Sequence, residues 1–285
     1  MNTADISYTN SDNSFSIFRS KKTGYFNMTK NHFHNEYEIY YLLSGERNYF
    51  IGDRTFHVIK GDLVLINNFD VHKTTDSGVP SHERILIHFR KEFLQNKYNE
   101  MQEILFFLFN SGHNTIRLPA HERNFVESLL FRMLQEVQTM PMGFEAYLQS
   151  LLIQLAVFLD RHIEKGLNKP FEHLSETHKK ISEIAQYISR NYNQPITLSL
   201  LSERFFISPY YLTRIFKKLT GFTLIEYLNS VRVKQAQILL VESRWKMDKI
   251  TEKCGFGSIS HFGRVFKSVS GVSPLQYRNI NNNSG

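Results

Sequence analysis

Imidazole, carboxylate and phenol side chains are concentrated in the first ninety residues of this chain. They are His32, His34, Glu38, Tyr40, Tyr49, His72 and His88. Such groups can stack on a sugar or a similar metabolite and form hydrogen bonds with its hydroxyls. In a strand, alternation places His34, Glu38 and Tyr40 on one face. We therefore expect a site for a small polar ligand here. The alternative is that this face is exposed to solvent or hydrogen-bonded internally.

A second group of chemically informative residues lies near the C-terminus, where one pattern occurs twice at an offset of fifty residues. Ser208, Arg214, Phe216, Lys217, Gly221 and Tyr227 recur as Ser258, Arg264, Phe266, Lys267, Gly271 and Tyr277. Apolar residues between these anchors follow the i, i+3, i+4, i+7 spacing of one helical face. The first copy has Leu212, Ile215, Phe216 and Leu219, and the second has Phe262, Val265, Phe266 and Val269.

The opposite face of each helix is polar or basic and is free to meet an anionic partner. These faces carry Tyr210, Thr213, Arg214 and Lys217, and then Ser260, His261, Arg264 and Lys267. A shorter helix is expected before each, over 199–206 and 247–254, and Ser208 and Ser258 suit the N-cap position. This plan is typical of two helix-turn-helix units. The alternative is a helical packing repeat, as in a solenoid.

The charge distribution supports a nucleic-acid module at the C-terminal end. The chain has 285 residues, 41% of them hydrophobic, and a net charge of +7. Residues 171–285 contain 16 Lys and Arg against 8 Asp and Glu, whereas residues 1–170 contain 18 against 19. A basic half beside a neutral half is expected when a nucleic-acid-binding domain is attached to another domain. A solvated basic surface is the alternative.

The C-terminal repeat resembles the DNA-binding domain of AraC/XylS-type transcriptional regulators. The second unit reads, from Gly255 to Arg278, GFGSISHFGRVFKSVSGVSPLQYR, with the family's Gly-Phe turn, Arg-x-Phe-Lys, Gly-x-x-Pro and Tyr-Arg elements. A long helix over 223–241 fits the family's linker pattern. The resemblance covers the last hundred residues. Ser202 and Thr251 depart from it, because the family often has Ala at these helix contacts.

This resemblance implies which side chains read DNA. In the first recognition helix we expect base contacts from Tyr210, Thr213 and Arg214. In the second, motif position implies Ile259, Ser260, His261 and Arg264, and we expect Lys217, Lys218 and Lys267 to contact phosphates. The two helices would enter successive major grooves, about 34 Å apart. The 223–241 helix would set that distance.

Short alternating segments in the N-terminal part predict strands over 37–43, 47–51, 55–59, 62–66 and 84–89. Hairpin turns are expected at 52–53 and 60–61. Close spacing without intervening helices favours a small antiparallel barrel or a double-sheet jelly roll. The overall prediction is an α+β multidomain protein, in which a β barrel and helices precede an all-α domain.

The N-terminal region also resembles a cupin. The first cupin motif is present as His32, His34, Glu38 and Gly45, while the second retains Gly61 and His72 but has Asn68 where proline is frequent. In cupin enzymes these His and Glu residues hold a metal, and the donor set suits iron, manganese or zinc. The regulators use the same barrel to hold small molecules, often without metal. We expect no metal and no cofactor, and a role in ligand contact or in internal hydrogen bonding.

The middle of the chain is predicted to be helical over 92–110, 121–139 and 144–162. The last of these has a seam of Phe144, Leu148, Leu151, Leu155 and Phe158, which suits either a short helix pair or burial within one subunit. Residues 165–177 have linker composition, and a further helix is expected over 178–191. The predicted domains are therefore 1–164, for effector binding and dimerisation, and 178–285, for DNA binding.

These features together predict a ligand-responsive transcriptional regulator that is not an enzyme. The resemblance favours an activator, with double-stranded DNA, a small-molecule effector, a second copy of the chain and RNA polymerase as partners. A carbohydrate is the expected effector class. The alternative is a metal-dependent cupin enzyme with an accessory DNA-binding domain. Cys254 should be a small buried group. A polar N-terminus and the lack of long apolar runs indicate a cytosolic protein without membrane contact.

Overall fold

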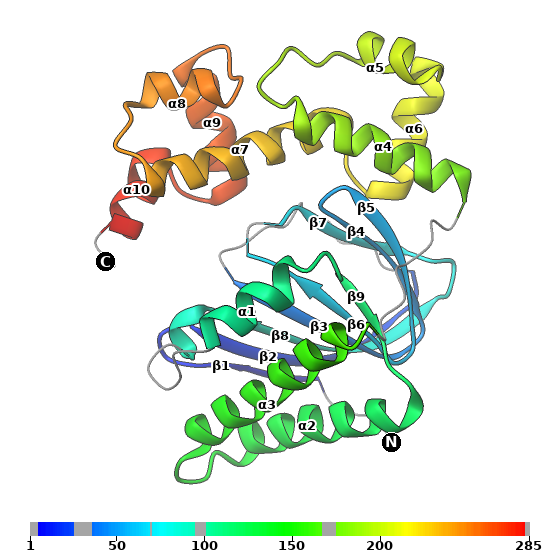
Figure 1. The fold of residues 1–285 in the computed structure, drawn as a ribbon, viewed down its shortest axis with the longest axis vertical. Coiled ribbons are helices and arrows are strands. Elements are labelled where there is room, and N and C mark those ends of the chain that lie inside the picture. The colour runs from blue at the N-terminus through cyan, green and yellow to red at the C-terminus, as the bar shows by residue number, and fades with distance from the viewer. Residues whose placement is uncertain (1–4, 26–35, 69, 95–100, 167–174, 283–285) are drawn as a thin grey trace.

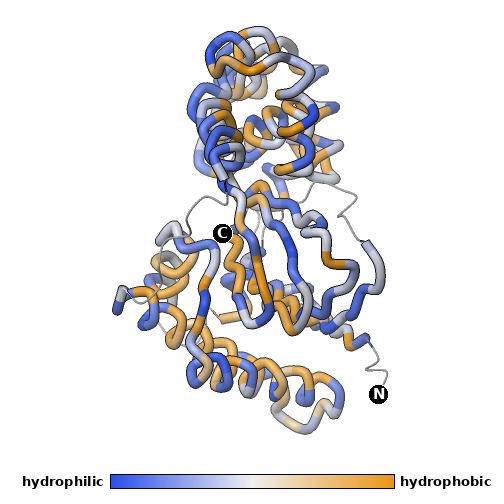
Figure 2. Tube along the Cα trace, turned by 90° about the vertical axis from the view of Figure 1, so that its right-hand side faces the viewer, coloured by the Kyte–Doolittle hydropathy of each residue, from blue (hydrophilic) through white to orange (hydrophobic). Residues whose placement is uncertain are grey.

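The computed structural model describes residues 5–25, 36–68, 70–94, 101–166 and 175–282. These residues form a lobe of strands and helices and a second lobe made only of helices (Figure 1). Figure 2 shows both lobes from the side, with hydrophobic and hydrophilic segments interleaved along the chain.

The first lobe contains two antiparallel sheets that face each other. One has the strand order β1-β2-β8-β3-β6-β9 and the other has the order β5-β4-β7. The strands are β1 (Ile6–Thr9), β2 (Phe15–Thr23), β3 (Tyr37–Ser44), β4 (Glu46–Ile51), β5 (Arg54–Ile59), β6 (Asp62–Ile66), β7 (His72–Asp76), β8 (Ser81–Phe89) and β9 (Thr115–Arg117). The predicted antiparallel fold is confirmed, as is the hairpin turn at Gly52 between β4 and β5. The hairpin predicted at 60–61 is wrong, because the turn at Gly61 joins β5 and β6, which belong to different sheets. Strands β1, β2, β7 and β9 were not predicted.

Strand alternation divides this lobe into two cores. On β3, Ile39 and Tyr41 face outward into a core that the helices cover, whereas Tyr40 and Leu42 belong to a core between the two sheets. The covering helices are α1 (Met101–Asn110), α2 (Ala120–Thr139) and α3 (Phe144–Glu164), which lie against the six-stranded sheet (Figure 1). The space between the sheets is therefore separate from the main apolar core.

Two helix predictions are refined by the structure. Leu148, Leu151 and Leu155 are fully buried against the sheet and α2, so this seam is used within one subunit and cannot form a helix pair between subunits. The helix predicted over 92–110 is confirmed over Met101–Asn110, whereas Lys91–Phe93 form a 3-10 turn and residues 95–100 lie outside the described residues.

The helical lobe consists of two three-helix units that share a long helix. The helices are α4 (Glu176–Arg190), α5 (Leu198–Phe205), α6 (Pro209–Thr220), α7 (Leu224–Glu242), α8 (Met247–Lys253), α9 (Ile259–Ser270) and α10 (Pro274–Asn282). The first unit comprises α4, α5 and α6, and the second comprises α8, α9 and α10, with α7 between them (Figure 1). Cys254 is free and buried in the second unit, as predicted. No helix among the described residues is long and apolar enough to span a membrane.

Candidate nucleic-acid interface and ligand-binding barrel

The first recognition helix, α6, is held at both ends by local capping. The Ser208 hydroxyl accepts a hydrogen bond from the Tyr211 amide at 3.4 Å, and the left-handed Gly221 ends the helix. Leu212 and Phe216 are fully buried. The opposite face is exposed to solvent, including Tyr210 with 78% of its surface accessible, together with Thr213, Arg214, Lys217 and Lys218.

The second recognition helix, α9, repeats this arrangement. Ser258 accepts from the His261 amide at 3.2 Å, and Gly271 has the same φ of 78° as Gly221. Phe262 and Phe266 are buried. Ile259 is 53% exposed, and Ser260, Arg264 and Lys267 are also exposed, whereas His261 is half-buried with its ring 5.7 Å from that of Phe256.

Helix α7 is tied to both units, so it can fix the relation between the two recognition helices. At its start, Thr223 and Glu226 form a reciprocal capping box. Arg232 donates to the carbonyls of Tyr192 and Gln194 in the first unit, at 2.8 and 3.1 Å. At its end, Arg278 of the second unit donates to the Leu240 carbonyl at 3.3 Å. Two exposed basic helix faces on one connected support suit contact with phosphates and base edges.

Inside the barrel, Glu38 lies between two histidines. Its Oε2 is 3.1 Å from Nε2 of His88 and 3.5 Å from Nε2 of His72. Nδ1 of His72 lies 2.8 Å from the Asp70 carbonyl, to which it donates. Burial lowers the pKa of His72, but the hydrogen bond and charge of Glu38 outweigh this effect and hold the pKa above its ordinary value. The group is an internally hydrogen-bonded cluster with charged character.

The predicted effector residues are partly brought together. Glu38, Tyr40, His72 and His88 all point between the sheets, as alternation required. Tyr40 is fully buried, with its ring 5.0 Å from that of Tyr49 in an edge contact. His32 and His34 lie outside the described residues. Within the described part of the chain, no three His, Cys, Asp or Glu side chains are arranged to hold a metal ion.

The sequence interpretation missed several polar residues of the barrel interior, namely Arg47, Thr74, His82 and Arg84. Arg47 is only 1% exposed, and its Nε donates to the Thr74 hydroxyl at 3.1 Å. Arg84 lies over the Tyr40 ring, with its guanidinium carbon 5.9 Å from the ring centroid. Burial, together with the charges of Arg47 and Arg84, lowers the pKa of His82 to about 4. The alternation of Arg47 with Tyr49 was the available signal.

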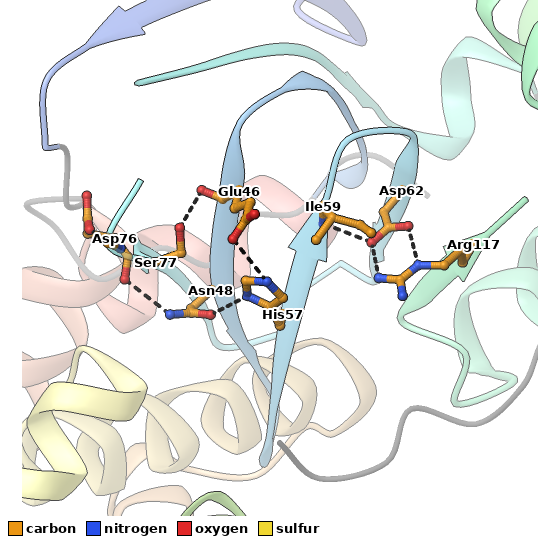
Figure 3. Close-up of polar contacts among 9 residues, drawn as sticks. Glu46, Asn48, His57, Ile59, Asp62, Asp76, Ser77 and Arg117 are labelled. Atoms are coloured by element: carbon orange, nitrogen blue, oxygen red, sulfur yellow. Dashed lines mark hydrogen bonds and ion pairs between the residues drawn. The ribbon is translucent and has the colours of Figure 1, made fainter. Parts of the chain in front are cut away.

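The outer face of the three-stranded sheet has its own polar network (Figure 3). Asn48 donates to the Asp76 carbonyl at 3.1 Å, and the His57 ring lies between Asn48 and Glu46. Nearby, Arg117 of β9 forms two hydrogen bonds with Asp62, at 2.8 and 2.7 Å. These contacts fix the strand ends and satisfy the Asp62 carboxylate.

The three-stranded sheet also contacts the first helix-turn-helix unit. Phe50 packs against Phe222 and Tyr227, with ring centroids 6.0 and 5.5 Å apart. The Tyr227 hydroxyl donates to the Gly52 carbonyl at 2.8 Å. Lys73 Nζ donates to the Gly221 carbonyl at 2.5 Å. Barrel and DNA-binding domain are therefore joined by an aromatic cluster with hydrogen bonds at its edge.

Comparisons with known proteins agree with this two-part organisation. A model described as an AraC-like ligand binding domain matches residues 21–156, and one described as a helix-turn-helix domain matches residues 201–280. The chain is 27% identical, over 255 residues, to the HTH-type transcriptional activator RhaR of Escherichia coli, covering 88% of this chain and 87% of RhaR.

Similar solved structures include one that matches nearly the whole chain and one of an isolated DNA-binding domain. ToxT from Vibrio cholerae is 14% identical, with a TM-score of 0.38, over 94% of this chain and 98% of ToxT. The DNA-binding domain of AdpA, solved with a target DNA, is 28% identical with a TM-score of 0.35, over 36% of this chain and 93% of that domain.

Proposed function

The chain belongs to the AraC/XylS-type transcriptional regulators, and we propose that a ligand in its barrel controls DNA binding through the contact between β4, β7 and the first helix-turn-helix unit. The family assignment makes it a ligand-responsive, DNA-binding regulator of transcription. The proposal concerns the route by which the ligand acts.

The alternation of two strands supports this route. On β4, Tyr49 points into the barrel against Tyr40, and the next residue, Phe50, points out onto Phe222 and Tyr227. On β7, His72 points inward to Glu38, while Lys73 reaches Gly221 and lies 5.3 Å from the Phe222 ring centroid. A ligand that moves the inward side chains therefore also moves their outward neighbours. It shifts the equilibrium only if its affinity differs between the two arrangements.

At the DNA, we propose that Arg214 and Arg264 read guanines while Lys217, Lys218 and Lys267 contact phosphates. Arg forms two parallel hydrogen bonds with guanine, whereas Lys acts as a point charge toward phosphate. The exposure of these side chains on α6 and α9 supports the assignment. Tyr210, Thr213, Ile259, Ser260 and His261 would complete the base contacts.

We further propose that the protein acts as an activator, as RhaR is named, and that it works as a homodimer with RNA polymerase. The proposed domain boundaries are 1–164 and 178–285, joined by a linker. Exposed aromatic residues on α2 and α3, Phe125 and Tyr147, are about 40% accessible and suit a subunit contact. Sedimentation of the full chain and of Phe125→Ser tests the dimer, because the variant should dissociate at a higher protein concentration than the wild type.

The route is tested by breaking the contact between the domains. Thermal-shift screening of the full chain against metabolites identifies a compound that stabilises it. A reporter and a DNA-binding assay are then compared for the wild type and for Phe50→Ala with Lys73→Ala. We expect the double variant to bind DNA and the compound, but the compound should no longer change its DNA binding or its reporter activity. Tyr25→Ala is the control, because the Tyr25 side chain is an aromatic residue of the barrel domain that is 72% exposed. A normal response in the double variant would contradict the route.

A further inference from the structure

The turn that connects α5 to α6 has an unusual residue at its centre (Figure 1). Phe206 has a φ of 53° and a ψ of 48°, in the left-handed region, where a Cβ is disfavoured and glycine is common. The Phe206 amide donates to the Glu203 carbonyl at 3.4 Å. The next amide, of Ile207, donates to the Ser202 carbonyl at 3.0 Å. These are the two hydrogen bonds of a Schellman motif, so the end of α5 fixes the left-handed conformation.

The second helix-turn-helix unit has the same motif with a different residue. Its two corresponding hydrogen bonds end α8, at 2.9 and 3.0 Å, and the left-handed residue is Gly255, with a φ of 76°. An added Cβ there would lie 2.8 Å from backbone atoms of Tyr192 and Asn193. The second unit therefore needs glycine at this place. The first unit has phenylalanine instead, at a cost in backbone conformational energy.

Packing within the protein does not offset this cost. Phe206 is 91% exposed, more than any other large apolar side chain among the described residues of the helical lobe. The adjacent Ile207 packs against the core of the first unit, so the turn directs Phe206 away from that core. An exposed ring gains no free energy from burial in the free protein. An aromatic residue that is both strained and exposed is expected where a partner covers it.

The position of Phe206 in the chain identifies DNA as that partner. Phe206 lies three residues before Pro209, the first residue of α6. The N-terminal residues of a recognition helix contact base edges in the major groove, so the turn that leads into this helix lies beside the groove. Tyr210, the second residue of α6, is itself 78% exposed. Phe206 thus continues, along the chain, the exposed surface that is proposed to read bases.

We propose that Phe206 is a specificity-determining residue, whose ring contacts the methyl group of a thymine at the edge of the site that α6 reads. The thymine methyl is the apolar group of the major groove, and an aromatic ring can contact it without a hydrogen bond. Removal of both apolar surfaces from water favours the contact. The inference rests on the proposed base reading by α6 and adds a residue of the preceding turn to it.

The test uses the purified full chain and a DNA site selected with it from random sequences. Phe206→Gly should raise the urea midpoint, because glycine adopts this backbone conformation without strain. The same variant should weaken binding to the selected site about fivefold or more. Replacing each thymine of the site in turn by deoxyuridine removes one methyl group at a time. At one position this should weaken binding of the wild type by a similar factor and leave binding of the variant unchanged.

Met140→Gly is the matched control. Met140 also has positive φ, at 43°, and is 52% exposed, but it ends α2 in the first lobe. Its replacement should raise the urea midpoint without changing DNA binding. Phe206→Leu keeps an apolar side chain and should retain part of the affinity, which separates the contact from the change of backbone.

Four results would overturn the inference. The first is equal DNA binding by the wild type and Phe206→Gly, and the second is an equal loss on every DNA sequence. The third is a lower urea midpoint of Phe206→Gly, because the ring would then stabilise the turn. The fourth is a loss of reporter activation with unchanged DNA binding, which would assign the ring to a contact with RNA polymerase.

Arg214→Ala distinguishes failure of this inference from failure of the proposed base reading. If Arg214→Ala relaxes sequence preference and Phe206→Gly does not, the inference alone is wrong. If neither variant changes sequence preference, the proposed reading of bases by α6 is wrong as well.

Discussion

The two helix-turn-helix units have the same local structure but different surroundings. The buried core of the first unit includes Phe50 and Val71 from the barrel, whereas that of the second is built from residues 233 onward. Gly221 and Gly271 end their recognition helices with the same φ, and each amide donates to the carbonyl four residues earlier. An added Cβ would lie 2.5 Å from Lys73 at Gly221 but would meet nothing within 4 Å at Gly271.

The two units also differ in the residues at one equivalent position of their interiors. The first contains a cavity of about 430 Å³ lined by apolar residues such as Ile196, Leu224 and Leu228. At the position equivalent to Leu228, the second unit has Arg278, which donates to the carbonyls of Leu240 and Trp245. The first unit, which carries this apolar pocket, is also the one that contacts the barrel. If the proposed route holds, two units of the same local structure have different roles: the first responds to the barrel and reads DNA, and the second only reads DNA.

The largest expected effect comes from removing the aromatic residue between the domains. Phe222 is fully buried against Phe50, whereas its counterpart Val272 is only partly buried. We expect Phe222→Ala to lower the free energy of unfolding by about 3–5 kcal/mol, as for other buried phenylalanines, and Val272→Ala by clearly less. Urea denaturation followed by fluorescence and circular dichroism measures both. Equal losses would show that the first unit gains nothing from the barrel.

A smaller effect is expected at the DNA surface, where the two units should behave alike. Arg214→Ala and Arg264→Ala should each weaken binding to a selected site by roughly 1–3 kcal/mol and relax sequence preference. Competition between the selected site and random DNA provides the measurement. Lys217→Ala, the control for a phosphate contact, should weaken binding to the selected site and to random DNA by the same factor. An unchanged ratio in either Arg variant would mean that this unit does not read bases.

The sequence predicted the helical lobe well because its signals are local. Ser208, Ser258 and the two glycines mark helix ends through contacts within four residues, so α6 and α9 were located correctly. Thr223 likewise caps α7 where the helix was expected to begin. Such short-range hydrogen bonds do not depend on the rest of the fold.

The barrel interior was harder to predict, because a strand that lines a polar site lacks hydrophobic alternation. Strand β2 turns Ser16, Ser20 and Lys22 inward, and β7 contains no apolar residue at all. Arg47, in contrast, lies on a strand that was predicted, but a charged side chain is rarely expected to be fully buried. The contact between the domains could not be predicted either. In the sequence Phe50 is an ordinary strand residue, and only the tertiary structure places it against Phe222.

Substitution of the paired glycines sharpens the comparison at a single backbone position. Gly221→Ala and Gly271→Ala should each cost about 1–2 kcal/mol in stability, because both residues have positive φ. Only Gly221→Ala should also displace Lys73, since the added methyl would meet that side chain. The urea midpoints measure the loss of stability that both variants share. A loss of the response to the effector indicates that Lys73 is displaced. A loss of response in Gly271→Ala would contradict this division of roles.

The smallest effect is expected from the ion pair that links α7 to the barrel. Lys234 Nζ lies 2.6 Å from Asp70 Oδ1, and both side chains remain more than 20% exposed. Water and salt screen such a pair, and ordering two flexible side chains offsets part of the attraction, so a coupling of about 0.2–1 kcal/mol is expected. A double-mutant cycle with Asp70→Asn and Lys234→Gln, read as the urea midpoint, measures it. A coupling as large as the Phe222 effect would mean that charge, and not the aromatic cluster, holds the first unit to the barrel.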